Sequence, residues 1–509
     1  MADKKFLQEL TSFCQQRGLF WGPEPEIYGG LAGFYTFGPL GKLLKNRVEN
    51  SIRKTFQKYG FWEVECPTVM PKEVWEASGH LGGFSDPIII CSKCKAMFRV
   101  DSLIEEHEPD YKGADYLDKI KELKLKCPSC KSDFTMEIKR HNLMMKTTIG
   151  LDKEAYNRPE TATTTYLPFP RYADYFRKKL PFAVFQIGKA YRNEISPRQY
   201  LFRMREFTQA EAQIFLFKDQ KDEFEQYDDV KNEKLPLLPS SAQEKTHEPI
   251  SISVEEACKK KHFKNKAYAF AVFLAYNQFR NLGILERNIR LRQHKDDEKA
   301  FYADDAWDIE IKFQSFGWLE VCGIHDRTDY DLTQHAKFSG AKLELMNEKT
   351  QKKEAPQVIE IAFGSDRPTF AIVDNFYDKK LIDEGKTMFK LPYHIAPIQA
   401  AVFPLMKKPE LTAIAKKIFE DLMVDSVCEY DDSGSIGKRY LRAAEKGIPF
   451  CITIDYQTVE DNTVTIRDRD TEKQIRIKIA GLKDILKGLL NGEKLEKHGS
   501  IIKGNASAE

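Results

Sequence analysis

Two adjacent segments within residues 187–215 alternate like the strands of a hairpin, yet one face carries charge where a core would be expected. The side chains that the two-residue period puts on this face are Gly188, Ala190, Arg192 and Glu194 in the first segment and Arg203, Arg205, Phe207, Gln209, Glu211 and Gln213 in the second. Arginine matches phosphate oxygens through a planar fork, and an aromatic ring can cover a flat base. With the room above the two small residues, this surface could hold a nucleoside triphosphate. A solvent-exposed hairpin with surface salt bridges fits the stretch equally well.

The composition is that of a globular protein with a substantial core. The chain has 509 residues, of which 42% are hydrophobic and 31% are charged, which is enough for about two to four domains. The formal net charge of +2 neither favours nor excludes nucleic acid as a partner. No apolar run approaches the roughly 18 residues that span a bilayer. The first residues, "MADKKFLQELTSFCQQ", lack the apolar stretch of a signal peptide. We therefore expect a cytoplasmic protein that does not enter a membrane.

Hydrophobic spacing near the N-terminus predicts a helix followed by a strand. The segment "GPLGKLLKNRVENSIRKTFQKYG" is typical of an amphipathic helix, with Pro39 in its first turn and Gly60 at its end. In "FWEVEC", Trp62, Val64 and Cys66 alternate with glutamates, which predicts a half-buried strand.

Two later regions differ from the rest in composition. Residues 219–265 are strongly polar, which predicts an exposed or mobile elaboration of the surrounding domain. From residue 390 to residue 495, strand-like and helix-like segments alternate, as in a compact α/β domain. The polar tail after about residue 490 is expected to fray.

Four of the ten cysteines form two CxxC pairs, namely Cys91, Cys94, Cys127 and Cys130. Each pair can present two thiolates to one tetrahedral Zn²⁺ on a tight turn. The alternatives are two unrelated pairs or a redox motif, but thioredoxin-like motifs occur singly. We therefore favour a structural zinc site within an insertion at residues 88–135, although the long separation of the pairs is unusual. His107 and His141 are spare candidate ligands that are more often plain surface residues.

The charged hairpin resembles a known motif. "YRNEISPR" followed by "FRMREFTQAE" is similar to motif 2 of the class II aminoacyl-tRNA synthetases, and in full wording to the dimeric glycyl-tRNA synthetases. Other segments resemble that family in the same order: "GLAGFYTFGPLGKLLKNRVEN", "SGHLGGFSD", "HNLMMKTTIG", "RPETA", "GWLEVCGIHDRTDYDLTQH", "VIEIAFGSDR" and "DDSGSIGKRYLRAAEKGIPFCITID". The resemblance covers nearly the whole chain, apart from the tail and parts of residues 219–265.

The resemblance implies an α+β fold with three parts. These are an antiparallel-sheet class II catalytic domain at residues 1–87 and 136–385, which includes the elaboration at 219–265; a zinc-ribbon insertion at 88–135; and a C-terminal α/β anticodon-binding domain at 390–495. The helix that ends near Gly60, with the strand after it, resembles motif 1, which forms a dimer interface in this class. We therefore expect a homodimer.

The resemblance also implies a two-step reaction. Glycine and ATP give glycyl-adenylate and pyrophosphate, and the glycyl group then passes to the 3′-terminal adenosine of glycine tRNA. By position in the motif, Arg192 would bind the α-phosphate and neutralise the charge that grows as the glycine carboxylate attacks. Glu194 would accept a hydrogen bond from the adenine amino group, and Phe207 would stack on the adenine.

Three further positions complete the implied ATP site. Arg203 would hold the distal phosphates. Arg367, in "FGSDR", would pack on the other side of the nucleotide and reach the γ-phosphate. Glu320, in "GWLEVCG", would hold the Mg²⁺ that accompanies ATP. Positioning and electrostatics should then supply most of the rate, because this step needs little proton chemistry.

Glycine has no side chain to grip, so its ammonium must be bound. The family does this with glutamates in three segments, which match Glu160, Glu211 and Glu360. Lack of space at the α-carbon would exclude larger amino acids, so no editing domain is expected. The sequence departs from the family at Ala362, where a serine near the glycine is common, and at Gln213, where a second acid is frequent.

The C-terminal domain contains a basic turn and helix in "GSIGKRYLRAAEKG". Lys438, Arg439 and Arg442 could contact tRNA phosphates there, or they could form an ordinary solvated helix face.

Two other functions are less well supported. A non-catalytic nucleic-acid-binding protein on the same scaffold would have no need of Arg192, Glu194, Phe207 and Arg367 together. A class II synthetase for another amino acid, such as proline, threonine or histidine, is disfavoured by the three glutamates and by the wording of the whole chain.

Overall fold

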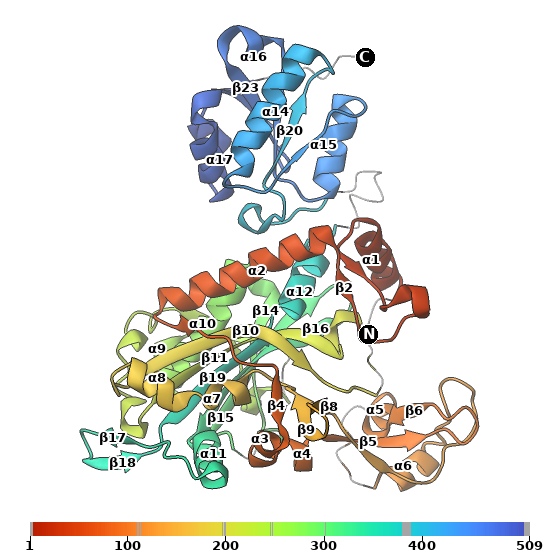
Figure 1. Ribbon diagram of the computed structural model, residues 1–509, viewed down its shortest axis with the longest axis vertical. Coiled ribbons are helices and arrows are strands. Elements are labelled where there is room, and N and C mark those ends of the chain that lie inside the picture. Colours follow the sequence, from red (N-terminus) through yellow and green to blue (C-terminus); the bar gives the residue numbers. More distant parts are fainter. Residues whose placement is uncertain are drawn as a thin grey trace.

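The computed structural model describes residues 4–108, 111, 113, 115–195, 197, 200–244, 246, 248–300, 302–378 and 388–502. A large body built on one sheet carries a small α/β domain at its top and a small module at its lower right (Figure 1). Among the described residues, no helix combines the length and the apolar content that a membrane crossing requires.

The main sheet has nine strands. Their order is β13 (Ile250–Ser253), β12 (Lys234–Leu238), β14 (Ile289–Gln293), β15 (Asp305–Phe313), β16 (Gly317–Thr328), β19 (Gln357–Gly364), β11 (Glu206–Leu216), β10 (Phe182–Tyr191) and β3 (Trp62–Glu63). All neighbours are antiparallel except β12 with β14 and β10 with β3. The expected antiparallel sheet of the large domain is therefore confirmed.

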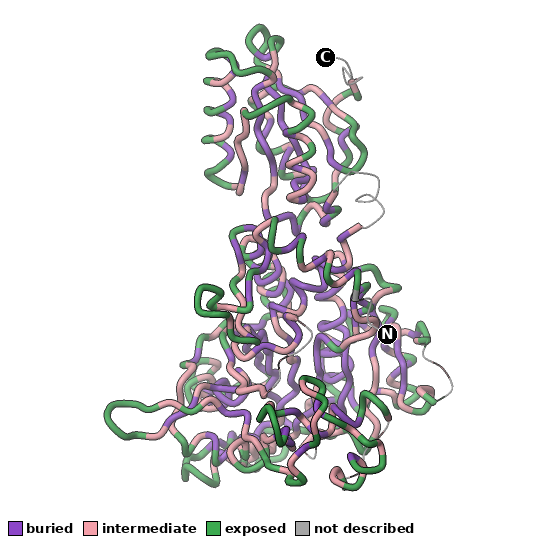
Figure 2. The backbone as a smooth tube through the Cα atoms, turned by 90° about the vertical axis from the view of Figure 1, so that its right-hand side faces the viewer, coloured by how far each residue is buried: buried purple, intermediate pink, exposed green. Residues whose placement is uncertain are grey.

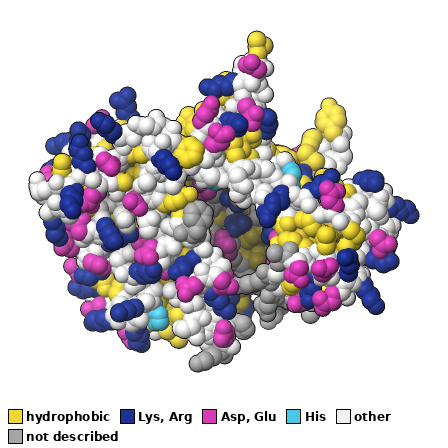
Figure 3. Space-filling view, turned by 90° about the horizontal axis from the view of Figure 1, so that it is seen from below, with side chains coloured by type: hydrophobic (Ala, Val, Ile, Leu, Met, Phe, Trp, Pro, Cys, Tyr) yellow, Lys and Arg dark blue, Asp and Glu magenta, His cyan; other side chains and the backbone are white. Residues whose placement is uncertain are grey.

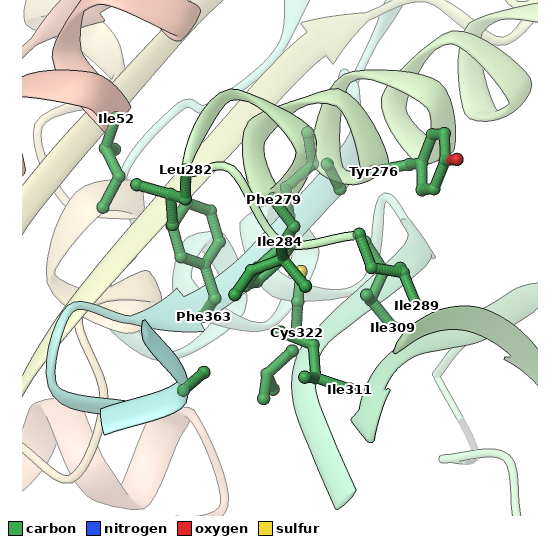
Figure 4. Close-up of a cluster of buried hydrophobic side chains, with 14 of the residues drawn as sticks. Ile52, Tyr276, Phe279, Leu282, Ile284, Ile289, Ile309, Ile311, Cys322 and Phe363 are labelled. Atoms are coloured by element: carbon green, nitrogen blue, oxygen red, sulfur yellow. The ribbon is translucent and has the colours of Figure 1, made fainter. Parts of the chain in front are cut away.

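Helices cover both faces of this sheet. One face packs against α1 (Lys4–Gln16), α2 (Pro39–Lys58), α10 (Lys266–Asn281) and α12 (Asp366–Phe376), and the other against α7 (Ala162–Tyr166), α8 (Phe169–Tyr175) and α11 (Tyr330–Ser339). The backbone tube shows buried residues concentrated between these layers (Figure 2). Figure 4 shows part of this core, where Phe279 and Leu282 near the end of α10 lie close to Ile52 of α2 and Phe363 of β19.

Helix α2 forms where its sequence predicts it. Pro39 stands in its first turn, and Gly60 follows it with a φ of 81° that favours glycine. The four-residue spacing of its apolar side chains buries one stripe, which includes Val48, Ile52 and Phe56. The ring of Phe56 lies 5.4 Å from that of Phe185 on β10. Burial of each such side chain is worth about 1.5–3 kcal/mol, so this stripe fixes α2 on the sheet.

The prediction of a strand after α2 holds for two residues only and is otherwise wrong. Strand β3 contains only Trp62 and Glu63, which pair with Val184 and Phe185 at the edge of the sheet. Trp62 is 53% exposed, whereas Cys66 is buried outside any strand. The alternation of apolar and acidic residues failed as a guide here because an edge strand has a neighbour on one side only.

The polar segment at residues 219–265 is not a loose loop. Its strands β12 and β13 extend the main sheet, and α9 (Val254–Lys259) follows them. Leu235, Leu237, Ile252 and Val254 are buried in the main core. The prediction of an exposed elaboration was wrong because these short strands bury apolar residues, which an average over the highly charged segment conceals.

Smaller elements surround the main sheet. They are β1 (Phe20–Trp21) with β2 (Thr36–Phe37), β17 (Leu345–Asn347) with β18 (Lys352–Glu354), and β4 (Val69–Pro71) with β9 (Lys153–Asn157) and β8 (Met145–Ile149), together with α3 (Lys72–Ala77) and α4 (His80–Gly83). The cysteine-bearing module consists of β5 (Ser85–Ile90), β6 (Met97–Arg99) and β7 (Lys139–Asn142) with α5 (Val100–Glu105) and α6 (Tyr116–Glu122).

The C-terminal domain is an α/β domain with its own core. Its strand order is β21 (Cys428–Tyr430), β20 (Ala400–Pro404), β22 (Phe450–Ile454), β23 (Thr463–Asp468), β24 (Gln474–Lys478) and β25 (Ile501–Ile502), with α14 (Pro409–Met423), α15 (Ile436–Glu445), α16 (Tyr456–Asp461) and α17 (Leu482–Leu490) around the sheet. The expectation that the tail frays after about residue 490 was wrong as far as Ile502, because β25 pairs with β24 and Leu495 is buried. The remaining tail lies outside the described residues.

Candidate active site

A pocket of about 480 Å³ opens between the main sheet and the cysteine-bearing module. From below, the surface is hollowed there, with acidic and basic side chains inside the hollow (Figure 3). All ten positions that the sequence assigned to ATP and glycine line it: Glu160, Arg192, Glu194, Arg203, Phe207, Glu211, Glu320, Glu360, Ala362 and Arg367. The structure therefore brings together side chains that lie up to two hundred residues apart in the sequence.

The hairpin of β10 and β11 forms the floor of the pocket. Ala190 pairs with Phe207, and Gly188 pairs with Gln209, so the face predicted from the alternation exists. Not every member of this face lines the pocket. Arg205 does not, because its side chain donates to the carbonyl oxygens of Glu194 and Ala32, each at 2.9 Å. In the connecting segment, residues 196, 198 and 199 lie outside the described residues.

The room above Gly188 is already filled, contrary to expectation. A Cβ at this position would collide with the guanidinium of Arg158. Arg158 is 1% exposed and donates to the carbonyl oxygens of Lys189 at 2.7 Å and Cys66 at 3.0 Å. The missing side chain of Gly188 thus serves an internal arginine that holds the hairpin from its side.

Arg192 is held at the end of β10 by aromatic rings. Its guanidinium carbon lies 5.4 Å from the ring centre of Phe84 and 5.3 Å from that of Phe207. Its Nε also donates to the carbonyl oxygen of Pro159 at 3.1 Å. These contacts hold the side chain at the pocket, and no hydrogen bond to another described residue occupies its terminal nitrogens, which suit an oxyanion.

Arg367 begins helix α12 and reaches the pocket from the far side. Its terminal nitrogens donate to the carbonyl oxygens of Glu320 and Phe202, each at 3.3 Å. The Glu320 carboxylate is 3.7 Å from the same guanidinium. On the opposite wall, the buried Oε2 atom of Glu194 has no hydrogen-bond partner among the described residues. A buried carboxylate oxygen without a donor fits a site that receives its donor from a ligand.

The three predicted glutamates each accept from a hydroxyl donor; Glu211 and Glu360 are buried, and Glu160 is half-buried. Thr163 donates to Glu160 at 2.8 Å, Tyr166 donates to Glu360 at 2.9 Å, and Thr161 donates to Glu211. Gln209 adds a second donor to Glu211 at 3.0 Å.

One arginine and two histidines that the sequence reasoning missed also face these acids. Arg327 pairs with Asp331 at 2.7 Å and with Glu360 at 3.2 Å, and its guanidinium lies 4.2 Å from the ring centre of Tyr302. His80 lies 3.5 Å from Glu160, and His325 lies 3.5 Å from Glu360. The alternation of His325 and Arg327 along β16 was a signal in the sequence for a shared face.

The three carboxyl groups differ in the direction in which their pKa values are shifted. Burial, followed by the charges of Glu360 and Glu160, raises the pKa of Glu211 to about 8. Burial opposes ionisation of Glu360 as well, but the Arg327 charge and the hydrogen bond with His325 outweigh it and lower the pKa of Glu360. The charge and hydrogen bond of His80 likewise lower the pKa of Glu160 against the effect of burial. Near neutral pH two of the acids are therefore ionised, while Glu211 is mostly protonated.

The two departures from the family occupy different places. Ala362 lines the pocket and pairs with Glu211 across β11 and β19. Gln213 is fully buried, pairs with Glu360, and does not line the pocket. Neither amide atom of Gln213 has a hydrogen-bond partner among the described residues.

The four CxxC cysteines meet at the tip of the cysteine-bearing module. Their sulfur atoms all lie within 4.8 Å of one another, with 3.4 Å between Cys91 and Cys130 and 3.6 Å between Cys94 and Cys127. Four thiol groups at this spacing suit one tetrahedral metal ion. His107 and His141 are not part of the cluster. His141 instead makes a 2.9 Å hydrogen bond with the carbonyl oxygen of Asn193, in the segment that follows β10.

The basic residues of the C-terminal domain do not all face solvent. Lys438 is exposed. Arg439 is 3% exposed and donates to the carbonyl oxygens of Pro404 and Gly434, so it cannot contact tRNA as predicted. Arg442 is half-buried and pairs with Asp431.

Comparisons with known proteins identify the two larger domains. Residues 146–242 match the model of the tRNA synthetase class II core domain (G, H, P, S and T), and residues 399–489 match that of the anticodon binding domain. The crystal structure of a prolyl-tRNA synthetase from Cryptosporidium parvum, complexed with L-proline and AMP, has a similar fold. The TM-score is 0.56 at 14% identity, over 96% of this chain and 78% of that one. The fold is that of a class II aminoacyl-tRNA synthetase.

Curated relatives identify the family within this class of synthetases. The glycine–tRNA ligase of Pyrococcus horikoshii is 39% identical over an alignment of 570 positions, which covers 96% of this chain and 99% of that protein. That of Methanocaldococcus jannaschii is 38% identical, over 95% of this chain and 99% of that protein. The chain belongs to the glycine–tRNA ligase family.

Proposed function

We propose that the chain is a glycine–tRNA ligase, which activates glycine with ATP and transfers the glycyl group to the 3′-terminal adenosine of glycine tRNA. One observation carries the proposal: a single pocket contains both a group of carboxyl side chains, two of them on β11 and β19, and arginines just beyond the ends of β10, β11 and β19. Carboxylates suit the ammonium of an amino acid, and arginines suit the phosphates of ATP. The order of residues along β11 places the two ends side by side, as adenylate formation requires.

The nucleotide end comprises Arg192, Glu194, Arg203, Phe207 and Arg367. The glycine carboxylate attacks the α-phosphorus, the bond to the bridging oxygen breaks, and pyrophosphate leaves. Arg192 stabilises the charge that develops on the α-phosphate oxygens. The unpartnered oxygen of Glu194 accepts from the adenine amino group, and the ring of Phe207 stacks on the base. Arg203 and Arg367 hold the distal phosphates.

The glycine end comprises Glu160, Glu211 and Glu360. Glu160 and Glu360, already ionised and fixed by hydroxyl donors, hold the glycine ammonium together with Glu211. Arg327 keeps Glu360 in place and balances part of the negative charge. The short side chain of Ala362 adds no hydrogen bond to the substrate.

Two metals are part of the proposal. Glu320 lines the pocket beside Arg367 and would hold the Mg²⁺ that accompanies ATP, which screens the phosphate charge. Cys91, Cys94, Cys127 and Cys130 would hold a structural Zn²⁺. The buried side chains of Cys91 and Cys127 belong to the small core of the module, so the metal would tie that core together.

The partners of the proposed enzyme follow from the remaining parts. The C-terminal domain would bind the anticodon of glycine tRNA, with Lys438 as the remaining candidate of the three predicted residues for a phosphate contact. A homodimer would form through α2 and the edge strand β3, which exposes Trp62. We place the enzyme in the cytoplasm.

ATP–pyrophosphate exchange with each amino acid tests the function. We expect exchange with glycine and little with alanine or serine. Exchange with a different amino acid would identify a synthetase for that residue. Folded protein without exchange for any amino acid would favour a non-catalytic binding protein.

The zinc site has a separate test. Metal content is measured for the wild type and for the Cys91→Ser/Cys127→Ser variant. We expect about one zinc per chain in the wild type and none in the variant. Equal metal content in the two proteins would refute the site.

A further inference from the structure

A lysine on α2 lies buried beneath the nucleotide end of the pocket. The Lys45 side chain is 5% exposed, and its ammonium forms an ion pair with Asp366. It also donates to the Thr208 hydroxyl at 2.7 Å, and it lies 4.4 Å from the ring centre of Phe37. The carboxylate of Asp366 in turn accepts from the backbone N–H of Thr208 at 2.6 Å. Lys45, Thr208 and Asp366 therefore form one closed set of contacts, named here the Lys45 junction.

The residues beside this junction face the nucleotide. Thr208 directly follows Phe207 on β11, and Asp366 directly precedes Arg367 at the start of α12. Both Thr208 and Asp366 also border the pocket, whereas Lys45 does not. A shift in the junction would therefore move an aromatic ring on one wall and an arginine on the other.

Close backbone contacts leave the junction little freedom to adjust. The N–H of Ser365 donates to the carbonyl oxygen of Thr208 at 3.0 Å. A Cβ on Gly364 would lie 2.9 Å from that same oxygen, so the two strand ends touch without intervening side chains. A second residue of α2, Glu49, accepts from the Ser365 hydroxyl at 3.1 Å. Helix α2 therefore holds the ends of β11 and β19 at two points.

We propose that Lys45 is a positioning residue of the ATP site, which fixes Phe207 and Arg367 relative to each other without contacting the nucleotide. The inference rests on the proposed function for the identity of the ligand. Its physical basis is that a buried carboxylate next to bound phosphates needs a cation. Without Lys45, Asp366 would be an uncompensated negative charge at the edge of the pocket.

The test compares ATP binding with glycine use. Lys45→Met keeps the length of the side chain and removes the charge. We expect the dissociation constant for ATP, measured by calorimetry on the full chain, to rise about 10–100-fold. The KM for ATP in exchange should rise in parallel, while the KM for glycine changes by less than about two-fold, because the glutamate cluster makes no contact with Lys45.

The chain offers a matched control for a general loss of stability. Lys221 is another buried lysine, paired with Asp326 at 2.7 Å and 2.8 Å behind the same sheet and outside the pocket. Lys221→Met should lower the melting temperature without raising the dissociation constant for ATP. An equal rise in both variants, or unchanged ATP binding in Lys45→Met, would overturn the inference.

A milder variant covers the case in which Lys45→Met does not fold. Thr208→Val removes one acceptor of the ammonium and keeps the shape, so it should weaken ATP binding about five-fold. Unchanged ATP binding in Thr208→Val would then count against the junction. Failure of the proposed function is distinguishable, because it would show in the wild type as absent glycine-dependent exchange, whatever the variants do.

Discussion

The two ends of the pocket are built in opposite ways. At the glycine end, Glu211 and Glu360 are each 3% exposed, and each is fixed by side chains that are themselves buried. At the nucleotide end, the Arg367 side chain is 36% exposed and the Glu320 side chain is 55% exposed. The first end is a rigid internal network, and the second is a set of arginines at strand ends and helix starts.

The difference suits the sizes of the two ligands proposed for this pocket. Glycine offers only an ammonium and a carboxylate, so its site must be preorganised. The buried charges of that site must then be neutralised by partners within the protein. ATP brings its own charge and a large flat base, so a few aimed side chains suffice. Changes at the glycine end should therefore affect stability and binding together, whereas changes to the arginines that line the nucleotide end should affect activity alone.

The largest effect is expected for Arg327→Met at the glycine end. This change leaves Asp331 and Glu360 buried without their cation, which should lower the free energy of unfolding by about 3–5 kcal/mol. Denaturant unfolding measures the loss, and exchange should show a raised glycine KM. Unchanged stability would mean that the network is not rigid, and the contrast between the two ends would fail.

Arg192→Gln is the matched change at the nucleotide end. Loss of one charged donor to the transition state should reduce glycine-dependent exchange about 10²–10³-fold. The melting temperature should stay close to that of the wild type, because Arg192 has one carbonyl acceptor and two ring contacts to lose. A large fall in melting temperature would show instead that Arg192 stabilises the fold.

The raised pKa of Glu211 predicts a pH dependence that belongs to the glycine end. The folded chain keeps a proton on Glu211 up to about pH 8, whereas the unfolded chain loses it near the ordinary value of 4.5. The contribution of Glu211 to stability is therefore present at low pH and is lost as pH rises between these values. Ionised Glu211 binds an ammonium better, so glycine affinity should increase over the same rise.

The Glu211→Gln variant isolates this effect. Glycine kcat/KM of the wild type, followed from pH 6 to pH 9, should rise toward about pH 8, while the profile of the variant should lose that rise. The KM for ATP provides the internal control, since no member of the nucleotide end shares this group. An identical profile in both proteins would assign the titration elsewhere.

The smallest effect is expected for Ala362→Ser. Residue 362 lines the pocket, so the new hydroxyl adds a hydrogen-bond donor beside the proposed glycine position. One such bond is worth about 1 kcal/mol, so the glycine KM should fall about five-fold with activity retained. A strong rise in the glycine KM would show that residue 362 does not lie beside the substrate.

The sequence was sufficient to find the pocket but not its supports. The ten predicted residues that line it were identified through segments that resemble family motifs, and the four cysteines pair by local spacing. Local spacing likewise predicted α2, because one helix face carries its own period. These features depend on neighbours in sequence, and so they could be predicted.

The supports depend on contacts between distant residues. Nothing near Gly188 indicates that Arg158 fills the space above it, and the surroundings of Arg327 give no sign of its pairing with Glu360. Strands β12 and β13 were overlooked because they are short and lie within a segment whose average charge is high. Arg439 lies in a basic segment and was therefore predicted to face solvent. Only the fold reveals that its guanidinium donates to carbonyl oxygens inside the domain.

The Lys45 junction limits how this enzyme can be recombined with its relatives. Its three members come from segments separated by 163 and 158 residues, so nearly every crossover point within the catalytic domain separates one from the others. Consider a chimera that takes the hairpin and α12 from one parent and α2 from another. Its buried aspartate then comes from the first parent, whereas the residue at position 45 that must neutralise it comes from the second. Functional hybrids should therefore be those in which both parents carry the pair, or in which all three segments are transferred together.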